Sequence, residues 1–424
     1  MHPDKKISLE ETPDLAEQLV QAAADYPYAC ILLSNSQAGS EKQVLAGYAS
    51  SAALDEKEPG KSFAQLHSLL DRSPGWYFGH LSYDLKNETE SLASSRPELH
   101  GFGAMRFFSP ELLVRTDDSG NLKISPPGAA LPEKKGPVSS PVLNGKIVIR
   151  QQSSREEYIA TAQKLLTHIH RGDIYEINYC IGFYAENVTL DPPALFLRLN
   201  KLAAAPFAAL YRNGDSWLIC ASPERFLQKK GDCIISQPIK GTRPRGKNET
   251  EDRALAEELK NDPKEQSENV MIVDLVRNDL SKVAKRGSVK VDELFGIHSF
   301  KTVHQMISTV SAELREDVHA AEAIKAAFPM GSMTGAPKVR AMQLAEEHEQ
   351  MRRGLYSGAV GYFTPEGDFD FNVVIRSILY NAATGYLSLM VGSALTAAAD
   401  PEKEYEECLL KARGLFEALG VSGF

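Results

Sequence analysis

No helix or sheet can run unbroken through the middle of this chain, because five prolines fall between residues 123 and 146. The same segment is rich in Gly, Ser and Lys. Proline fixes φ and lacks a backbone N–H, so this composition excludes a regular helix or a central strand. We interpret residues 123–146 as a linker that closes an N-terminal region, residues 1–146, and precedes a second region, residues 147–424. The prolines are Pro126, Pro127, Pro132, Pro137 and Pro141.

Length and charge narrow the class of protein. A single hydrophobic core usually stops growing near about 250 to 300 residues, so a chain of 424 residues predicts two domains or one composite fold. With 43% hydrophobic and 24% charged residues, the composition is that of a globular protein. A net charge of -9 disfavours nonspecific binding to nucleic acid or to an anionic membrane. An anionic ligand must therefore be bound by a local group of cations.

Cysteine usage and hydropathy indicate the compartment. The five cysteines form no close C-x-x-C pair, which argues against a disulfide framework or a structural zinc site. The N-terminus lacks the apolar stretch of a signal peptide, and no run approaches the roughly 18 apolar residues of a membrane helix. We expect a cytoplasmic protein that binds neither membrane nor nucleic acid.

Helix and strand signals alternate along the chain. Ser154-x-x-Glu157 predicts a capping box, and Gly172 predicts the end of the helix that it starts. Asp400-Pro401 and Gly420 bound a final helix in the same way. The class is therefore mixed α and β, without an indication of strand order. Strand-like runs are YACILLS (28–34), GWYFGHLSYDL (75–85), IYEINYCIGFY (174–184) and CIIS (233–236).

Two basic segments could bind an anion. QPIKGTRPRG (237–246) places Lys240, Arg243 and Arg245 in one turn, where a lysine desolvated beside other cations would lose pKa and become a nucleophile. FPMGSMTGAPKVRAM (328–342) leads through a Gly-rich turn into a helix whose N-terminus could receive a carboxylate, with Lys338 and Arg340 adding charge. A solvated basic loop and an ordinary helix start remain open as alternatives.

Three carboxylates could bind a metal. Glu404 and Glu407 share one face of the final helix, and Glu268 begins a second helix-like run. Such hard oxygen ligands suit Mg²⁺, although acids at a helix N-terminus are also favoured by the helix dipole alone. Arg376 lies in an apolar run, where a charge must be paired or bind an anion. His304 lies in a similar run, and spacing leaves its role open between structure and catalysis.

Eight motifs together resemble the chorismate-binding enzymes in their order and spacing. The resemblance spans about residues 150–420, and GWYFGHLSYDL extends it into the N-terminal region. It implies an α+β fold, a sandwich of two large β-sheets with outer helices to which both regions contribute strands. The motifs are GDIYEIN, ASPERF, PIKGTRPRG, KEQSENVMIVDLVRNDL, FPMGSMTGAPKVRAM, YSGAVGYF, NVVIRS and DPEKEYEE.

The residue at position 240 separates activities within that family. Anthranilate synthases typically read PIAGT and aminodeoxychorismate synthases PIKGT, and this chain reads PIKGT. The resemblance thus implies that Lys240 attacks C2 of chorismate as the C4 hydroxyl leaves, and that ammonia then adds at C4 on the route to p-aminobenzoate and folate. Isochorismate and salicylate synthases carry a water-activating lysine where this chain has Glu176. Anthranilate synthase component I and a non-catalytic chorismate-binding homologue remain the alternatives.

The resemblance also assigns roles to the candidate residues. Glu268 and Glu407 would bind Mg²⁺ directly and Glu404 through water, and Glu224 would protonate the departing C4 hydroxyl. The pocket would consist of Gly241, Thr242, His304, Tyr362, Arg376, Gly392 and Ser393, of which Thr242 and His304 line the ring and Tyr362, Arg376 and the backbone at 392–393 bind the pyruvyl carboxylate.

The sequence also indicates a partner subunit and shows where the chain differs from the family pattern. No cysteine lies in the Gly-rich elbow of a glutaminase, so ammonia would come from a separate glutamine amidotransferase subunit. Glu176, Met330 and Ala394 depart from the family pattern, where glutamine, a small residue and glycine are more common. ILLSNSQ replaces the Leu-Leu-Glu-Ser pattern of tryptophan feedback, and we therefore expect no tryptophan inhibition.

Overall fold

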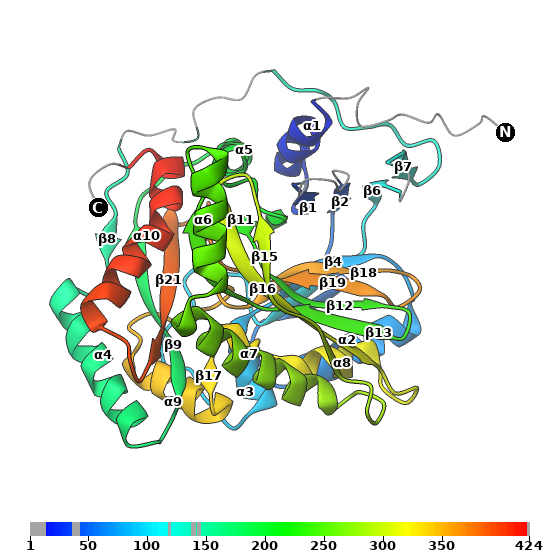
Figure 1. Cartoon of the computed structure of the whole chain (residues 1–424). Helices are drawn as coiled ribbons and strands as arrows, with labels where there is room; N and C mark the ends of the chain where they lie inside the picture. Colours follow the sequence, from blue (N-terminus) through cyan, green and yellow to red (C-terminus); the bar gives the residue numbers. More distant parts are fainter. Residues whose placement is uncertain (1–13, 36–42, 118–119, 137–140, 142–145, 422–424) are drawn as a thin grey trace.

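Two large β-sheets form the frame of the molecule (Figure 1). The computed structural model describes residues 14–35, 43–117, 120–136, 141 and 146–421. Pairing between the described strands is antiparallel throughout both sheets. The predicted class, α+β with two large sheets and outer helices, is confirmed.

The larger sheet has 11 strands. Along the sheet these are β17 (Gly335–Ala336), β9 (Glu176–Ala185), β21 (Tyr386–Thr396), β20 (Ser377–Asn381), β11 (Ser216–Ser222), β10 (Phe207–Asn213), β1 (Tyr28–Ser34), β2 (Gln43–Ala49), β6 (Leu112–Thr116) and β7 (Leu122–Ser125), with β8 (Arg150–Gln151) also paired to β9. The smaller sheet has 10 strands. These are β14 (Ile239–Pro244), β16 (Val303–Glu313), β13 (Cys233–Gln237), β12 (Arg225–Lys230), β19 (Phe369–Asn372), β18 (Ala359–Phe363), β4 (Tyr77–Leu81), β5 (Met105–Phe108) and β3 (Leu54–Glu56), with β15 (Lys290–Ser299) paired to β16.

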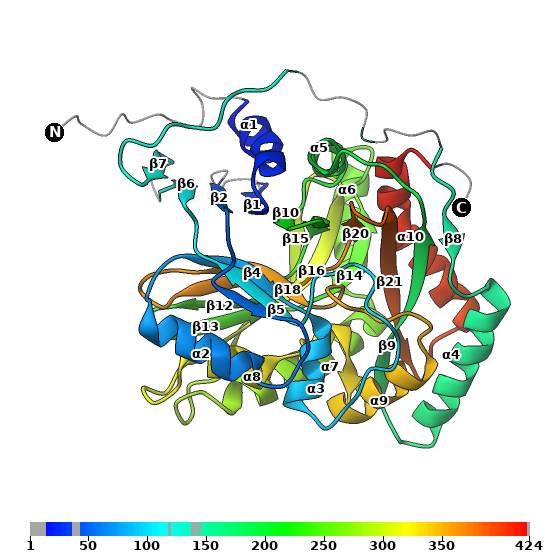
Figure 2. The same cartoon turned by 180° about the vertical axis from the view of Figure 1, so that it is seen from behind.

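Helices cover the outer faces of the two sheets (Figures 1 and 2). The larger sheet packs against α1 (Leu15–Ala22), α4 (Arg155–His170), α5 (Pro192–Ala203) and α10 (Pro401–Leu419), which share one hydrophobic core with it. A second core joins both sheets to α2 (Ser62–Arg72), α7 (Pro263–Ser281) and α8 (Ala320–Ala327). The remaining helices are α3 (Lys86–Thr89), α6 (Glu249–Lys260) and α9 (Lys338–His348).

The position of strand β1 explains why its sequence is largely apolar instead of alternating between apolar and polar residues. Ala29 and Ile31 belong to the core under α1 and α5, whereas Cys30, which faces the opposite side of the sheet, belongs to the core between the sheets. A strand buried on both faces needs an apolar residue at every position. The run YACILLS is therefore both a predicted and an observed strand.

Strands from both sides of the Pro-rich segment complete both sheets. β1 pairs with β10 in the larger sheet, and β4 pairs with β18 in the smaller one. The division at residue 146 therefore separates two parts of the sequence that share one framework. β7 extends to Ser125, three residues into the predicted linker, whereas residues 126–136 form neither helix nor strand. Residues 137–140 and 142–145 of the predicted linker lie outside the described residues.

The predicted helix boundaries are confirmed at both long outer helices. Ser154 accepts a hydrogen bond from the Glu157 amide while the Glu157 side chain accepts one from the Ser154 amide, which is the predicted capping box of α4. Asp400 caps α10, and Gly420 ends it in the left-handed conformation. In the part of the chain that the structure describes, no helix combines the length and apolarity needed to cross a membrane.

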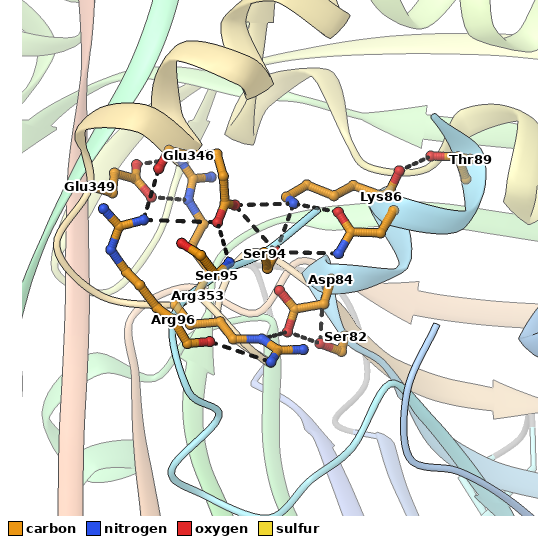
Figure 3. Close-up of polar contacts among 12 residues, drawn as sticks. Ser82, Asp84, Lys86, Thr89, Ser94, Ser95, Arg96, Glu346, Glu349 and Arg353 are labelled. Carbon is orange, nitrogen blue, oxygen red and sulfur yellow. Dashed lines mark hydrogen bonds and ion pairs between the residues drawn. The ribbon is translucent and has the colours of Figure 1, made fainter. Parts of the chain in front are cut away.

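A buried polar network holds the segment after β4 against α9 (Figure 3). Lys86 is almost fully buried, and its Nζ lies 2.9 Å from Ser94 Oγ and 3.2 Å from a Glu346 carboxylate oxygen. Arg96 donates to the Glu346 carbonyl at 2.8 Å. These contacts fix N-terminal residues to a helix of the second region beside the strand β9.

Candidate active site

Lys240 lies where the two sheets meet. It belongs to β14 of the smaller sheet, and its Nζ is 2.6 Å from Glu176 Oε1 on β9 of the larger sheet. A second carboxylate, Glu268 on α7, lies 3.8 Å from the same nitrogen. All three side chains are buried, so their charges act on one another with little screening by water.

The three cations of the QPIKGTRPRG segment (237–246) do not converge, which corrects the sequence-based expectation. Arg243 is bound by Asp262 at 2.7 Å and by Glu258 at 3.0 Å, and Arg245 by Asp252 at 2.6 Å. These acids belong to α6 and to the residue that precedes α7. Helices that pack beside β14 thus neutralise both arginines and leave Lys240 as the one cation of the segment that faces Glu176.

The pKa of Lys240 is raised rather than lowered. Burial alone lowers it, but the carboxylates of Glu176, Glu268 and Glu224 outweigh burial and raise the pKa overall. The expectation that neighbouring cations would lower this pKa was wrong, because the neighbours of Lys240 are acids. A nucleophilic role therefore requires that its proton be transferred, and Glu176 is placed to receive it.

The three predicted metal ligands lie on two helices. Glu268 projects from α7, and Glu404 and Glu407 project from α10. Lys264 connects two of them, with its Nζ 2.9 Å from Glu404 Oε1 and 3.8 Å from Glu268 Oε1. Burial raises the pKa of Glu268 to about 7, and Glu176 adds to this rise. The pKa of Glu407 is lowered, because Lys411 at 2.6 Å more than offsets the effect of burial.

Unsatisfied carboxylate oxygens in this region fit a hard cation. Among the described residues, Glu176 Oε2, Glu268 Oε1 and Glu404 Oε2 are buried and accept no hydrogen bond. Buried polar atoms are nearly always satisfied, and an unsatisfied carboxylate oxygen is costly. Mg²⁺ binds one or two carboxylates and keeps several waters, which matches this donor set. The oxygen donors of Glu268 and Glu404 therefore suit the magnesium ion that the sequence predicts, although no three described carboxylates in this region have ligand atoms within 4.8 Å of one another.

Glu224 has the properties of a proton donor. It lies between β11 and β12 and is 4% exposed. Burial raises the pKa of its carboxyl to about 7, although Ser332, Lys240 and the Ile239 amide oppose the rise. A carboxylic acid that retains its proton near neutral pH can act as a general acid.

A small cationic cavity opens beside β14. Its volume is about 110 Å³, and Thr242, Arg376 and Lys411 are among its lining residues. Arg376 adopts a φ of 51°, which is rare for a residue other than glycine and is typical of functional positions. Its guanidinium forms neither a hydrogen bond nor an ion pair with any residue that the structure describes. Arg376 is therefore free to bind an anionic group.

Lys411 is a site residue that sequence reasoning missed. It lies one turn after Glu407 on α10, and its Nζ donates to the Gly392 carbonyl at 2.9 Å. From sequence, this spacing indicates only a helix ion pair with Glu407. The structure shows that the same lysine also lines the cavity with Arg376 and so adds a second positive charge there.

Steric contacts explain why glycine occupies positions 241 and 392 of the predicted site. Gly241 has φ +83°, and a Cβ there would lie 2.8 Å from Leu259 Cδ1. A Cβ on Gly392 would lie 2.7 Å from Cys180 Sγ on the neighbouring strand β9. The adjacent Ser393 directs its hydroxyl toward α4, where it lies 2.9 Å from the Tyr158 hydroxyl. Neither residue lines the cationic cavity, and the link of Gly392 to it is the hydrogen bond that its carbonyl accepts from Lys411.

Of the predicted pocket residues, only Thr242 and Arg376 line the cationic cavity, and the side chains of Tyr362 and His304 lie elsewhere. Tyr362 stacks on Trp76 and lines a separate, larger cavity of about 370 Å³ between the sheets. The tyrosine beside Arg376 is Tyr356, which opposes the lowering that burial imposes on the pKa of Arg376. Both ring nitrogens of His304 are occupied, one 2.8 Å from Ser299 Oγ and the other 3.0 Å from Asp252 Oδ1. This geometry matches the structural alternative for His304.

The helix start after residue 337 is not an open anion site. Lys338 is bound to Asp279 and donates to the Pro329 carbonyl at 2.9 Å. Gly335 and Ala336 form β17, which pairs with the edge of β9 at Ile177 and Glu176. The segment thus supports the strand that carries Glu176, and the alternative of an ordinary helix start fits it better.

A buried ion pair covers the next part of the same strand edge (Figure 3). Arg353 donates to Glu349 at 2.6 and 2.8 Å and to the carbonyls of Asn178 and Met333 at 3.0 and 2.7 Å. Glu349 in turn accepts from the Cys180 amide at 3.0 Å. Along the edge of β9 between β17 and β8, the pair therefore takes the place of a neighbouring strand and fixes β9. Sequence reasoning did not anticipate this pair.

A second group of potential metal ligands lies elsewhere, on α2 and at the start of α8. Within the described ranges, His67, Asp71 and His319 form the one group whose ligand atoms lie within 4.8 Å of one another. The two imidazoles stack with 8° between their planes and 3.8 Å between centroids, so one metal cannot lie in both ring planes. His319 Nδ1 also accepts the Ala321 amide, which places the proton of the neutral ring on Nε2. We assign no metal to this group.

Comparisons with known proteins identify the family of this chain. The chain matches the family described as chorismate binding enzyme over residues 9–417. It is 34% identical over 391 residues to anthranilate synthase component 1 of Thermus thermophilus, covering 87% of this chain and 84% of that relative. It is 40% identical over 270 residues to aminodeoxychorismate synthase component 1 of Klebsiella aerogenes, covering 64% of this chain and 59% of that relative.

The fold is also that of a solved structure. Anthranilate synthase component I from Streptococcus pneumoniae superposes with a TM-score of 0.73 at 24% identity, covering 91% of this chain and 89% of that protein. At this identity the likeness concerns the fold alone. The sequence match, however, extends over nearly the whole chain and includes the segments that carry Lys240, Glu224 and Glu268. The chain therefore belongs to the chorismate-binding enzyme family.

Proposed function

We propose that this chain is an aminodeoxychorismate synthase component I, which converts chorismate and ammonia to 4-amino-4-deoxychorismate for p-aminobenzoate and folate synthesis. The observation that carries the proposal is the placement of Lys240. Its amine is buried, is 2.6 Å from the carboxylate of Glu176, and belongs to the PIKGT segment. An amine in this position can form a covalent bond to a substrate, whereas the alanine typical of anthranilate synthases cannot.

The proposed reaction has two displacements. Lys240 transfers a proton to Glu176, and its neutral amine attacks C2 of chorismate while the two ring double bonds shift, from C1=C2 to C1=C6 and from C5=C6 to C4=C5, and the C4 hydroxyl leaves. Glu224, with a pKa raised by burial to about 7, donates the proton with which that hydroxyl leaves as water. Ammonia then adds at C4, both double bonds shift back, and the amine of Lys240 is expelled from C2.

Substrate orientation follows from the distribution of charge. Chorismate carries two carboxylates, and the unpaired guanidinium of Arg376 together with Lys411 provides positive charge in one cavity. These groups suit the pyruvyl carboxylate, with Tyr356 beside Arg376. When bound by Glu268 and Glu407, and by Glu404 through water, Mg²⁺ would supply the positive charge that holds the ring carboxylate.

The ammonia would come from a separate glutamine amidotransferase subunit. The Klebsiella relative is named component 1, which supports a second component. Because this chain spans 59% of that relative, the activity of the whole relative is proposed here rather than transferred. Free ammonium should replace the partner subunit in vitro.

Anthranilate synthase component I is the second candidate. It is favoured by the Thermus relative, which matches more of this chain, 87%, than the Klebsiella relative does. The two activities share the metal site, the general acid and the cationic cavity. They differ in the need for Lys240, since formation of anthranilate does not require a covalent lysine adduct.

Substitution of Lys240 tests the proposal. Lys240→Ala should lower kcat by at least about 100-fold, while the Kd for chorismate, measured by calorimetry, should change by less than about threefold, because the amine reacts only after binding. Intact-protein mass spectrometry of the wild type, quenched during turnover without ammonium, should show an adduct of chorismate minus water that Lys240→Ala lacks. Equal losses of binding and turnover, or turnover that survives the substitution, would refute the nucleophilic role.

A further inference from the structure

Lys264 lies between two of the proposed metal ligands. It is in the first turn of α7, and its ammonium is 2.9 Å from Glu404 Oε1 and 3.8 Å from Glu268 Oε1. The Glu404 and Glu268 side chains are 3% and 7% exposed, whereas that of Lys264 is 44% exposed. A partly solvated cation thus lies between two buried carboxylates from different helices.

Without this cation, the carboxylates would be poorly compensated. Within the part of the chain that the structure describes, Lys264 is the one ion-pair partner of Glu404, and Glu268 has only Lys240 in addition. Two buried carboxylates at close range repel each other and require positive charge between them. Even so, Glu268 Oε1 and Glu404 Oε2 accept no hydrogen bond. Lys264 therefore supplies charge but leaves ligand positions unsatisfied.

We propose that Lys264 is an internal counter-cation that stabilises the metal-free site and is displaced when Mg²⁺ binds. The proposal rests on the magnesium site of the proposed function. Lys240 cannot take this part, because its side chain is 9% exposed and is held by Glu176 at 2.6 Å. The ammonium of Lys264 can move into water, because nearly half of its side chain is already exposed.

Displacement makes magnesium binding a competition. The apparent affinity of a site is reduced by the fraction of molecules in which it is free, so an occupying lysine weakens Mg²⁺ binding. Removing the lysine should have two opposite effects. It should tighten Mg²⁺ binding, and it should destabilise the metal-free protein by leaving Glu404 without its ion-pair partner and Glu268 with Lys240 alone. A lysine with a purely structural role would change stability alone.

Lys264→Met tests this, with Lys282→Met as the matched control. Lys282 lies at the other end of α7, is 51% exposed and pairs with Asp279 at 2.9 Å. Binding of Mg²⁺ is measured by calorimetry after EDTA treatment, and thermal unfolding is measured with and without Mg²⁺. Lys264→Met should lower the Kd for Mg²⁺ by at least about fivefold. It should also lower the metal-free Tm and increase the rise in Tm on adding Mg²⁺, whereas Lys282→Met should leave the Kd unchanged.

The outcomes separate this proposal from the one on which it rests. Equal or weaker Mg²⁺ binding by Lys264→Met than by the wild type overturns the counter-cation and leaves the metal site standing. Absence of Mg²⁺ binding in both proteins overturns the metal site and the counter-cation together. If the methionine variant does not fold, Lys264→Gln, which keeps a polar group at the position, is measured in the same way with the same expected direction.

Discussion

The Arg353–Glu349 pair allows a quantitative test of how β9 is held in place. The guanidinium of Arg353 donates hydrogen bonds to Glu349, to the carbonyls of Asn178 and Met333, and to Ser357. Both charged residues are 4% exposed. Glu349→Gln keeps the size of the side chain but leaves a buried guanidinium without its counter-ion.

The expected cost follows from that burial. Removing one partner of a buried ion pair typically destabilises a protein by about 3–5 kcal/mol, because the remaining charge is uncompensated. The chain provides a control with the same residues and spacing, since Glu249 and Arg253 also form an i,i+4 pair and their side chains are 80% and 79% exposed. Loss of an exposed pair of this kind costs at most about 0.5 kcal/mol.

Urea unfolding followed by tryptophan fluorescence measures both variants. Glu349→Gln should lose about 3–5 kcal/mol of unfolding free energy and Glu249→Gln at most about 0.5 kcal/mol. Because the pair also fixes the strand that carries Glu176, Glu349→Gln should lower kcat, whereas Glu249→Gln should not. A loss below about 1 kcal/mol for Glu349→Gln would refute the view that this pair holds the strand edge.

Three further changes test the site itself. Turnover should fall as the pH rises through about 7, because burial raises the pKa of Glu224 to about 7 and only the protonated carboxyl can donate. In a pH–rate profile, Glu224→Gln should lose this pH dependence, and its kcat should be lower by about 10²- to 10⁴-fold. Arg376→Met should raise the KM for chorismate by about 10- to 100-fold in steady-state assays, since a charged hydrogen bond contributes about 1.5–3 kcal/mol; an unchanged KM would exclude Arg376 from binding. Gly241→Ala should lower the Tm in a thermal melt, because φ is +83° and the added Cβ meets Leu259; an unchanged Tm would show that the strand relaxes without cost.

The elements that sequence predicted well are those determined locally. The capping box at Ser154, the glycine that ends α10 and the apolar run of β1 each depend on a few neighbouring residues. Strand order is different, because the pairing of β1 with β10 joins residues about 180 positions apart in this chain and leaves no local pattern. The same reasoning explains why the resemblance to a family, rather than periodicity, predicted two sheets.

Within the site, prediction failed where the contacts of a residue come from segments that are distant in the sequence. Lys240 was identified, but its contact with Glu176 depends on the meeting of two sheets, and the sequence suggested the wrong sign for its pKa shift. YSGAVGYF contains two tyrosines, and only the tertiary structure shows that Tyr356 rather than Tyr362 lies near Arg376. Lys411 was overlooked because its spacing from Glu407 has an ordinary explanation within one helix.

The central claim is that this chain aminates chorismate at C4, and product identity tests it most directly. The purified chain is incubated with chorismate, Mg²⁺ and ammonium, and the products are separated and identified by mass, with and without an aminodeoxychorismate lyase. The account predicts 4-amino-4-deoxychorismate, which the lyase converts to p-aminobenzoate. Anthranilate as the main product would contradict it, and would show that the lysine of PIKGT does not determine the reaction in this protein.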